Sequence, residues 1–405
     1  MGIQRGNRLR IGIEALAWGD ATGYGRFCRE IVSALVRTLT HCSFTLLMEP
    51  GTDPPAGCEV VRVRRDRDAF GGKISKLMRL ASIIAQAPVD LWFFPSPLHF
   101  VPVLSRVPLV ITVHDAIPAS YPRLIFPSWK DRIAWSAKLR LATLQAARIV
   151  TVSRRAQESV ARAYRVDEKL LTVIHSAPSA IFRPVSDDTA LLAISRRLDV
   201  PPAAPVIVYH GAFAPHKNLR ALARVFLKLC RDPENAELHL IFLGSLSAGN
   251  GAECNALREI CRETDRVRFP GLLEDADLAL ALNRATIAVL PSLEEGFGLT
   301  GLEAVACGAP LVCTKSSGVS EVLGDTAVYF DALDEEALYG HLKALIGDPS
   351  RRRCLRERGL TRVTALNWET AAKRLAGVFE APQPPSGAGR GSQLGLQGQN
   401  PCEPC

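Results

Sequence analysis

The sequence predicts an α/β protein made of two doubly wound parallel sheets, each in its own domain. The chain has 405 residues, about twice the commonest single-domain size, and its 47% hydrophobic and 22% charged residues are ordinary for a globular protein. Short apolar runs alternate with helix-like stretches along the chain, which is typical of strand–helix–strand units. A proline-rich break near the middle separates two such series.

The first series predicts an N-terminal Rossmann-like domain over residues 1–184. Near-continuous apolar runs such as residues 109–113 are expected of strands that are covered on both faces. We expect strands at 9–15, 44–48, 89–94, 109–113, 148–152 and 171–174. The helices expected between them span 26–36, 73–87, 129–147 and 154–164.

The second series predicts a domain of similar size over residues 205–366, after a stiff, turn-rich linker at 185–204. Its expected strands span 206–209, 237–243, 266–269, 286–290, 311–313 and 327–330. Ligands of such sheets bind outside the carboxyl ends of the strands, so we expect the site in a cleft between the domains. Residues 381–405 are rich in Pro, Gly, Ser and Gln and are expected to be disordered, and we interpret the Cys402-x-x-Cys405 pair in this tail as a chance pattern.

Composition narrows the class of protein further. No apolar run reaches the roughly 18–20 residues of a membrane-spanning helix, and the polar start of the chain lacks a signal sequence. The eleven cysteines are expected to be free thiols, so the sequence predicts a cytoplasmic protein. Residues 1–188 hold 26 basic and 16 acidic residues, against 23 and 25 in the rest, which indicates an anionic partner. No nucleic-acid-binding motif is present, so nucleic acid is not expected.

The most informative segment is residues 291–310. An apolar strand runs into a glycine-bearing loop, and a short helix is expected to open near Gly298 and to stop at Gly308. A helix N-terminus presents unpaired amides that suit a phosphate or a sugar hydroxyl. Glu295 in the loop and Glu303 in the helix can accept hydrogen bonds from hydroxyl groups. The alternative is a plain turn with a solvent-facing glutamate, which the length of the string disfavours.

This string resembles the E-x7-E signature of retaining GT-B glycosyltransferases of family 4 (GT4), with Glu295 and Glu303 at the two acidic positions. The resemblance covers about residues 9–380 and implies a GT-B fold whose domains face a cleft. It assigns residues 1–184 to the acceptor, residues 205–366 to the donor, and residues 367–380 to a helix that crosses back to the first domain. It also implies donor contacts by Phe297, Gly298 and Leu299.

Three other segments resemble the same family in chain order. The turn from Gly211 to Lys217-Asn218 matches a turn whose lysine contacts the donor diphosphate. His114-Asp115 matches a strand-end H-D-x-I-P motif, and Gly23 and Gly25 match a glycine loop close to the acceptor. By this resemblance, His114, Lys217 and Glu295 are catalytic. Lys217, Gly211, Glu295 and Glu303 bind the donor, with Glu303 on its ribose and Glu295 on the transferred sugar.

The activity implied is transfer of a hexose, mannose-like by preference, with retention, from a GDP- or UDP-linked sugar to a saccharide or lipid-linked acceptor in polysaccharide or glycoconjugate biosynthesis. No cofactor is expected. Charge that builds on the departing diphosphate would be stabilised by Lys217 and the helix amides. The alternative is a non-catalytic GT-B module that binds a nucleotide sugar or scaffolds a glycan-assembly complex.

Some positions depart from the family pattern. Ala212 stands where an arginine for the diphosphate is common, and His216, if protonated, would compensate in part. His175-Ser-Ala177 replaces a common N-G pair, which puts the interdomain contact in doubt.

Two D-x-D triplets, Asp66-Arg-Asp68 and Asp275-Ala-Asp277, are candidate metal sites, because such a motif can hold a divalent ion against a diphosphate. The first lies in a basic run and the second is expected to cap a helix, so no metal site is predicted.

The basic segment 63–79 places Lys73, Lys76 and Arg79 beside leucine and isoleucine. It predicts either a peripheral contact with the anionic inner face of a membrane or an ordinary half-buried helix with a solvated face. The second interpretation is favoured.

Overall fold

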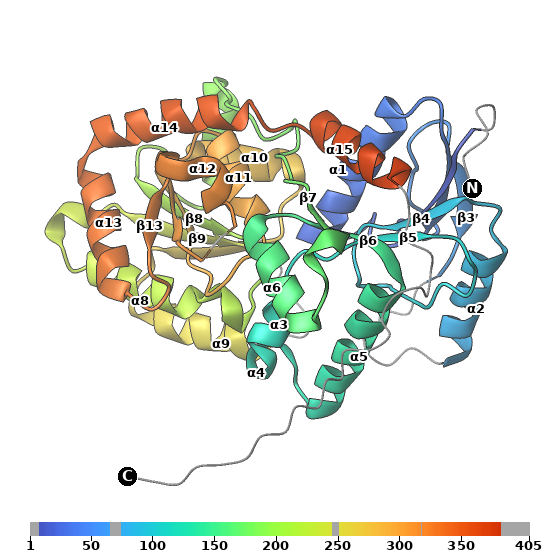
Figure 1. Ribbon diagram of the computed structural model, residues 1–405. Helices are drawn as coiled ribbons and strands as arrows, with labels where there is room; N and C mark the ends of the chain where they lie inside the picture. Colours follow the sequence, from blue (N-terminus) through green and yellow to red (C-terminus); the bar gives the residue numbers. More distant parts are fainter. Residues whose placement is uncertain (1–7, 65–73, 245–250, 317, 382–405) are drawn as a thin grey trace, which may run out of the picture.

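A computed structural model describes residues 8–64, 74–244, 251–316 and 318–381. It contains two parallel sheets, one from each half of the chain, with helices packed around both (Figure 1). The predicted fold class is confirmed. Within the described ranges, no helix is both long and apolar enough to cross a membrane.

The first sheet has seven strands in the order β3-β2-β1-β4-β5-β6-β7. Every pair is parallel, as expected for strands that successive helices connect. The strands are β1 (Arg10–Glu14), β2 (Ser43–Met48), β3 (Glu59–Arg62), β4 (Leu91–Phe94), β5 (Leu109–Thr112), β6 (Ala146–Thr151) and β7 (Leu171–Val173).

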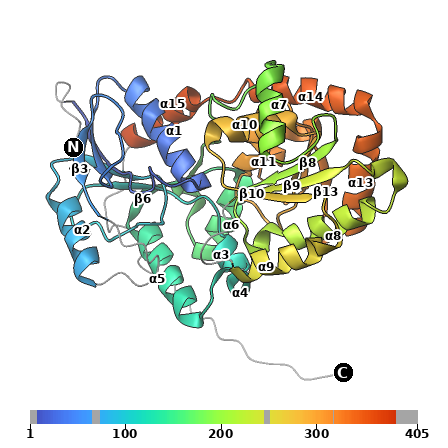
Figure 2. The same ribbon diagram turned by 180° about the vertical axis from the view of Figure 1, so that it is seen from behind.

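Helices cover both faces of this sheet. One face packs against α1 (Gly23–Thr38), and the other packs against α2 (Ile74–Gln86) and α5 (Trp129–Gln145). Figures 1 and 2 show α2 at the outer end of this domain and α5 on the lower side of the molecule, nearer the second domain. The remaining helices are α3 (Ile117–Ser120), α4 (Pro122–Ile125) and α6 (Arg154–Tyr164), with a 3₁₀ turn, η1 (Glu168–Leu170).

The second sheet has six parallel strands in the order β10-β9-β8-β11-β12-β13. They are β8 (Val206–His210), β9 (His239–Leu243), β10 (Val267–Gly271), β11 (Ile287–Leu290), β12 (Leu311–Thr314) and β13 (Val328–Phe330). One face packs against α8 (Leu219–Leu229), α9 (Gly251–Ile260) and α13 (Glu335–Gly347). The other packs against α10 (Asp275–Arg284) and α11 (Leu299–Ala306). The other elements are α12 (Ser320–Leu323), α14 (Pro349–Val363) and the 3₁₀ turns η2 (Pro215–Lys217), η3 (Pro233–Asn235), η4 (Cys261–Glu263) and η5 (Gly324–Thr326).

One apolar core runs through both domains. It joins the α1 face of the first sheet to the α10–α11 face of the second. The last helix, α15 (Trp368–Glu380), completes it by packing beside α1 (Figures 1 and 2), with the Trp368 ring 5.6 Å from that of Phe27. The two halves of the chain therefore share buried surface.

Three sequence-based expectations differ from the structure. The edge strand β3 was not predicted, because its burial is low and its ends are charged. The linker at 185–204 is not only turns: it contains α7 (Asp188–Arg197), which Asp187 caps and which buries Ile194. The helix expected to reach residue 147 ends at Gln145, where β6 begins. The proposed disorder of the tail and the Cys402–Cys405 pair concern residues 382–405, which lie outside the described residues.

Candidate active site

The strand β11 ends in the loop that carries Glu295, and α11 begins directly after Gly298. Gly298 is the N-terminal cap of α11 and has φ 90°, a left-handed conformation that favours glycine. Gly308, with φ 87°, follows the last turn. The helix expected between these two glycines is confirmed, and its first amides have no carbonyl partner one turn earlier.

Lys217 and Glu295 form a close ion pair beside this helix start. Lys217 Nζ lies 2.7 Å from Glu295 Oε1, and the Ser292 hydroxyl donates to the same oxygen at 2.6 Å. Burial alone would raise the pKa of Glu295, but the Lys217 ammonium and the Ser292 hydroxyl bring it below its ordinary value. Glu295 is therefore ionised at neutral pH and holds the lysine in place.

The turn that carries Lys217 is tied to the Glu295 loop by its neighbours. Asn218 adopts a left-handed conformation with φ 55°, and its side-chain amide donates to the carbonyls of Pro291 and Ala332. The backbone amide of Leu293 donates to the carbonyl of His216. Two segments about 75 residues apart thus fix the position of one ammonium group.

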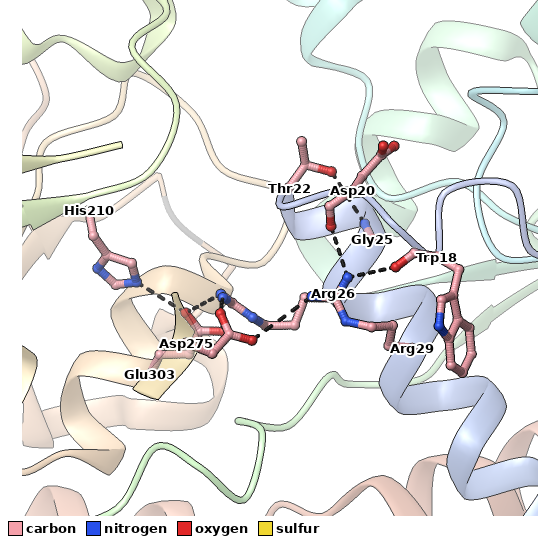
Figure 3. Close-up of polar contacts among 9 residues, drawn as sticks. All are labelled: Trp18, Asp20, Thr22, Gly25, Arg26, Arg29, His210, Asp275 and Glu303. Atoms are coloured by element: carbon pink, nitrogen blue, oxygen red, sulfur yellow. Dashed lines mark hydrogen bonds and ion pairs between the residues drawn. The ribbon is translucent and has the colours of Figure 1, made fainter. Parts of the chain in front are cut away.

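Glu303 lies one turn into α11 and is fully buried. Both of its oxygens accept from Nη1 of Arg26 at 2.8 Å, and Oε2 also accepts from Nε2 of His210 at 3.0 Å. Figure 3 shows Arg26 reaching from α1 to Glu303, with His210 on the far side of the carboxylate. The Glu303 carboxylate is therefore held by Arg26 of the other domain.

Arg26 has further partners. Its Nη2 donates to Asp275 at the start of α10, and its guanidinium lies 5.0 Å from the ring centroid of Phe182. The sequence patterns did not identify Arg26 or His210 as site residues. The available signal was the position of each: Arg26 opens a helix and His210 ends a strand, both on the side where ligands bind.

His114 and Asp115 follow β5 and lie against the Glu295 loop of the other domain at Gly296. Nε2 of His114 donates to the Pro95 carbonyl at 2.9 Å, and the rings of Tyr24 and Phe27 contact the imidazole edge-on. Burial lowers the pKa of His114 to about 4, so the imidazole is neutral at pH 7, with Nδ1 as the acceptor. Burial raises the pKa of Asp115 to about 6.

The predicted acceptor-side and donor-side glycines have different roles in packing. A methyl group on Gly25 would lie 2.1 Å from the carbonyl oxygen of Asp20, whereas Gly23 has open space around it. Gly211, with φ 142°, lies against the hydroxyl of Tyr209. Gly25 is therefore required by the loop that folds over the start of α1.

The domains also touch where the Glu295 loop meets the N-terminal domain. A methyl group on Gly296 would lie 2.3 Å from the carbonyl oxygen of His114. The hydroxyl of Ser153 donates to the carbonyl of Gly296 at 2.5 Å. The open side of Gly296 is therefore filled by the N-terminal domain.

A second contact between the domains involves Phe297, His175 and Glu321. The Phe297 ring is buried and stacks on His175 at 6.0 Å, and the predicted donor contact of Phe297 stays a prediction. Both carboxylate oxygens of Glu321 accept from the first amides of α6, which are those of Arg154 and Arg155, at 2.9 and 2.8 Å. The chain thus makes the interdomain contact that the departure at His175 had put in doubt.

Leu299, the first residue of α11, packs against the shared core.

Two other interpretations need correction. His216 cannot stand in for a cation, because burial and the nearby Lys217 lower its pKa to about 4. The carboxylates of Asp275 and Asp277 do not cap α10; they pair with Arg26 and Arg197. The other triplet, Asp66 to Asp68, lies outside the described residues.

A hollow of about 450 Å³ lies elsewhere, between β6, β7 and α15, and includes Arg148 and Arg374 among its lining residues. None of the predicted site residues lines it.

The two buried imidazoles predict how stability depends on pH. In the unfolded chain His114 and His216 take up a proton near pH 6.5, whereas in the folded chain they do so only near pH 4. Between these values the unfolded state binds more protons, so stability is expected to fall as the pH is lowered. Melting temperatures at pH 7 and 5 should differ less for a His114→Asn, His216→Asn variant than for the wild type. The exposed His41→Asn serves as a control, and an unchanged pH dependence in the double variant would contradict the prediction.

The comparison with protein families decides the identity of the chain. Residues 204–348 match the family described as "Glycosyl transferases group 1", and residues 21–177 match "Glycosyltransferase Family 4". The two matches cover about three quarters of the chain, one in each domain. The chain belongs to this glycosyltransferase family.

Relatives of this glycosyltransferase include an O-antigen chain mannosyltransferase B from Escherichia coli. It is 27% identical over 280 residues, which is 67% of this chain and 70% of the relative. A D-inositol 3-phosphate glycosyltransferase from Salinispora tropica is 29% identical over 286 residues, which is 67% of this chain but only 59% of the relative's own length. Both relatives are named as glycosyltransferases, and this glycosyltransferase is an enzyme that transfers glycosyl groups.

Among solved structures, this glycosyltransferase is similar to the Anabaena protein HepE in complex with UDP-glucose. The TM-score is 0.73 at 15% identity, and the alignment covers 93% of this chain and 100% of HepE. At this identity the likeness shows a common GT-B fold.

Proposed function

We propose that this glycosyltransferase moves a hexose, with retention and without a metal ion, from a nucleoside diphosphate sugar to a saccharide or lipid-linked acceptor. The observation that carries the proposal is the Lys217–Glu295 pair beside the start of α11. An ammonium group and a helix N-terminus together suit the negative charge that develops on a departing diphosphate.

The roles proposed for the remaining residues are those that the family resemblance implies, and the geometry of each residue is compatible with its role. Glu303, with no exposure to solvent, is suited to accept from the two hydroxyls of a ribose. Neutral His114 offers Nδ1 as an acceptor for a sugar hydroxyl, so we propose that it positions the substrate instead of removing a proton. Glu295 would bind a hydroxyl of the transferred sugar through the oxygen that Lys217 leaves available.

A mannose-like donor is favoured in this proposal. The support is the H-D-x-I-P motif from His114 to Pro118 and the relative named as a mannosyltransferase. HepE is described as binding UDP-glucose, so both GDP- and UDP-linked sugars belong in the test.

The experiment is a panel of GDP-mannose, UDP-glucose, UDP-galactose and ADP-glucose, incubated with the purified enzyme and a membrane extract as the source of acceptors. Nucleotide release is followed in EDTA, and the anomeric configuration of the product is read by NMR. Release with GDP-mannose in EDTA and a retained configuration support the proposal. Tight donor binding without turnover of any donor would instead favour a non-catalytic module.

We further propose that the N-terminal domain rests on an anionic membrane through a surface made by α2 and α5. Large apolar side chains are exposed there, at Leu77 and Met78 on α2 and at Trp129 and Ile133 on α5. Both helices pack on the same face of the first sheet, and Arg79, Lys130, Arg132 and Arg140 are exposed on them. Exposed apolar groups among basic residues suit the boundary of an anionic bilayer. Lys73 lies outside the described residues, and the side chain of Lys76 is not described.

The double variant Trp129→Ser, Ile133→Ser is expected to lower co-sedimentation with phosphatidylglycerol-containing vesicles by about tenfold, because it removes the two most exposed apolar groups of α5. Leu333→Ser is the matched control, since Leu333 is even more exposed but lies in the C-terminal domain. Equal sedimentation of all three proteins would contradict the membrane proposal.

A further inference from the structure

Arg26 sits where local structure gives no reason for a cation. It belongs to the first turn of α1, whose positive end disfavours a cation, and that turn contains no acidic residue. Its carboxylate partners, Glu303 and Asp275, come instead from the other domain (Figure 3). The side chain is only 12% exposed, so the pairing is largely shielded from water. The position of Arg26 is therefore fixed by carboxylates of the other domain and not by contacts within its own helix.

The contacts of Glu303 set up a competition with the donor. Its two oxygens already accept three hydrogen bonds, two from Arg26 and one from His210. A ribose that offers two hydroxyls to this carboxylate needs the oxygen lone pairs that Arg26 now uses. A donor that binds Glu303 therefore has to release the Arg26 guanidinium from at least one oxygen.

A new partner for that guanidinium lies within reach. Glu303 follows Leu299 by four residues, so the two residues lie about 6 Å apart along the axis of α11, and a diphosphate is expected at the Leu299 end. Nε of Arg26 is buried and has no hydrogen-bond acceptor among the described residues, so it is a spare donor. A planar guanidinium with several N–H groups suits two phosphate oxygens.

The donor domain itself is short of cations at this point. Lys217 is already neutralised by Glu295, His216 is uncharged at pH 7, and position 212 is an alanine. We propose that Arg26, from the N-terminal domain, is a donor-binding residue. When the nucleotide sugar binds, the Arg26 guanidinium leaves Glu303 and binds the diphosphate. This inference rests on the proposed function and adds a residue and a partner exchange to it.

The test compares the affinities of nucleoside diphosphates and nucleosides by isothermal titration calorimetry. GDP and guanosine, and UDP and uridine, are titrated into the wild type and into Arg26→Gln. The diphosphate gain is the affinity of the diphosphate divided by that of its nucleoside. In Arg26→Gln we expect this gain to fall by about tenfold or more, with nucleoside affinity unchanged or increased. Arg37→Gln, on the same helix and paired with Glu369 in the exposed part of the interface, is the matched control and should keep the full gain.

A rescue variant separates a ligand contact from a structural role. Adding Ala212→Arg to Arg26→Gln should restore much of the diphosphate gain. The new arginine supplies a guanidinium from the donor domain, at a position where an arginine for the diphosphate is common. Equal losses of nucleoside and diphosphate affinity, or a full gain in Arg26→Gln, would overturn the inference. If Arg26→Gln does not fold, Arg26→Lys replaces it in the test. We again expect a lower diphosphate gain, and we expect Ala212→Arg to restore it. A wild-type enzyme that binds neither GDP nor UDP would refute the proposed function instead.

Discussion

Replacing Lys217 by methionine is expected to lower kcat/KM for the productive donor by about 100-fold or more. The variant keeps the length of the side chain but removes the ammonium group beside the start of α11. Charge on the departing diphosphate would then depend on helix amides and Arg26 alone. Steady-state rates of nucleotide release, measured across donor concentrations, should show the loss mainly in kcat, because the charge develops in the transition state.

The lysine prediction has two controls. Lys228→Met removes an exposed lysine that pairs with Glu336 far from the crevice, and it should leave the rate unchanged. Lys217→Arg should recover part of the activity, since it restores the charge with a different shape. A wild-type rate in Lys217→Met would show that the ammonium does not contact the diphosphate.

The second large effect is expected from Glu303→Ala, which should lower the free energy of unfolding by about 3 kcal/mol and abolish donor binding. The substitution leaves Arg26, a nearly buried guanidinium, with Asp275 as its remaining ion-pair partner, and breaking a buried ion pair from one side is strongly destabilising. Thermal melting and titration with GDP or UDP measure the two effects separately.

A double-mutant cycle gives the sharper result. Arg26→Ala should cost less stability in the Glu303→Ala background than in the wild type, because the two residues share one interaction. Glu369→Ala is the matched control: this carboxylate also pairs with an arginine of α1 but is half exposed, and its loss should cost no more than about 1 kcal/mol. Additive effects of Arg26→Ala and Glu303→Ala would show that the contact contributes little.

Local patterns were sufficient to predict the sheets. Among the residues that the structure describes, near-continuous apolar runs marked twelve of the thirteen strands, because a parallel strand covered on both faces has almost no polar positions. The exception is β3, an edge strand that begins and ends with a charged residue. The glycines that bound α11 were also informative, since a left-handed cap favours glycine at the position itself.

The partners within the site could not be predicted in the same way. Arg26 and Glu303 are 277 residues apart, and only the docking of two domains brings them together. The motif at residues 291–310 identified Glu295 and Glu303 as acidic positions, but a pattern of one segment carries no information on which cation faces each carboxylate. Charges that are balanced across an interface become visible only in three dimensions.

The backbone contact at Gly296 has a consequence for how closely the lobes can approach. Gly318 lies against the same backbone contact, because a methyl group added to Gly318 would lie 2.3 Å from the carbonyl oxygen of Gly296. Alanine at Gly296 would press the Glu295 loop against the N-terminal domain, and alanine at Gly318 would crowd the Gly296 carbonyl and the hydroxyl of Ser153. The two glycines together therefore set how closely the Glu295 loop can approach the N-terminal domain.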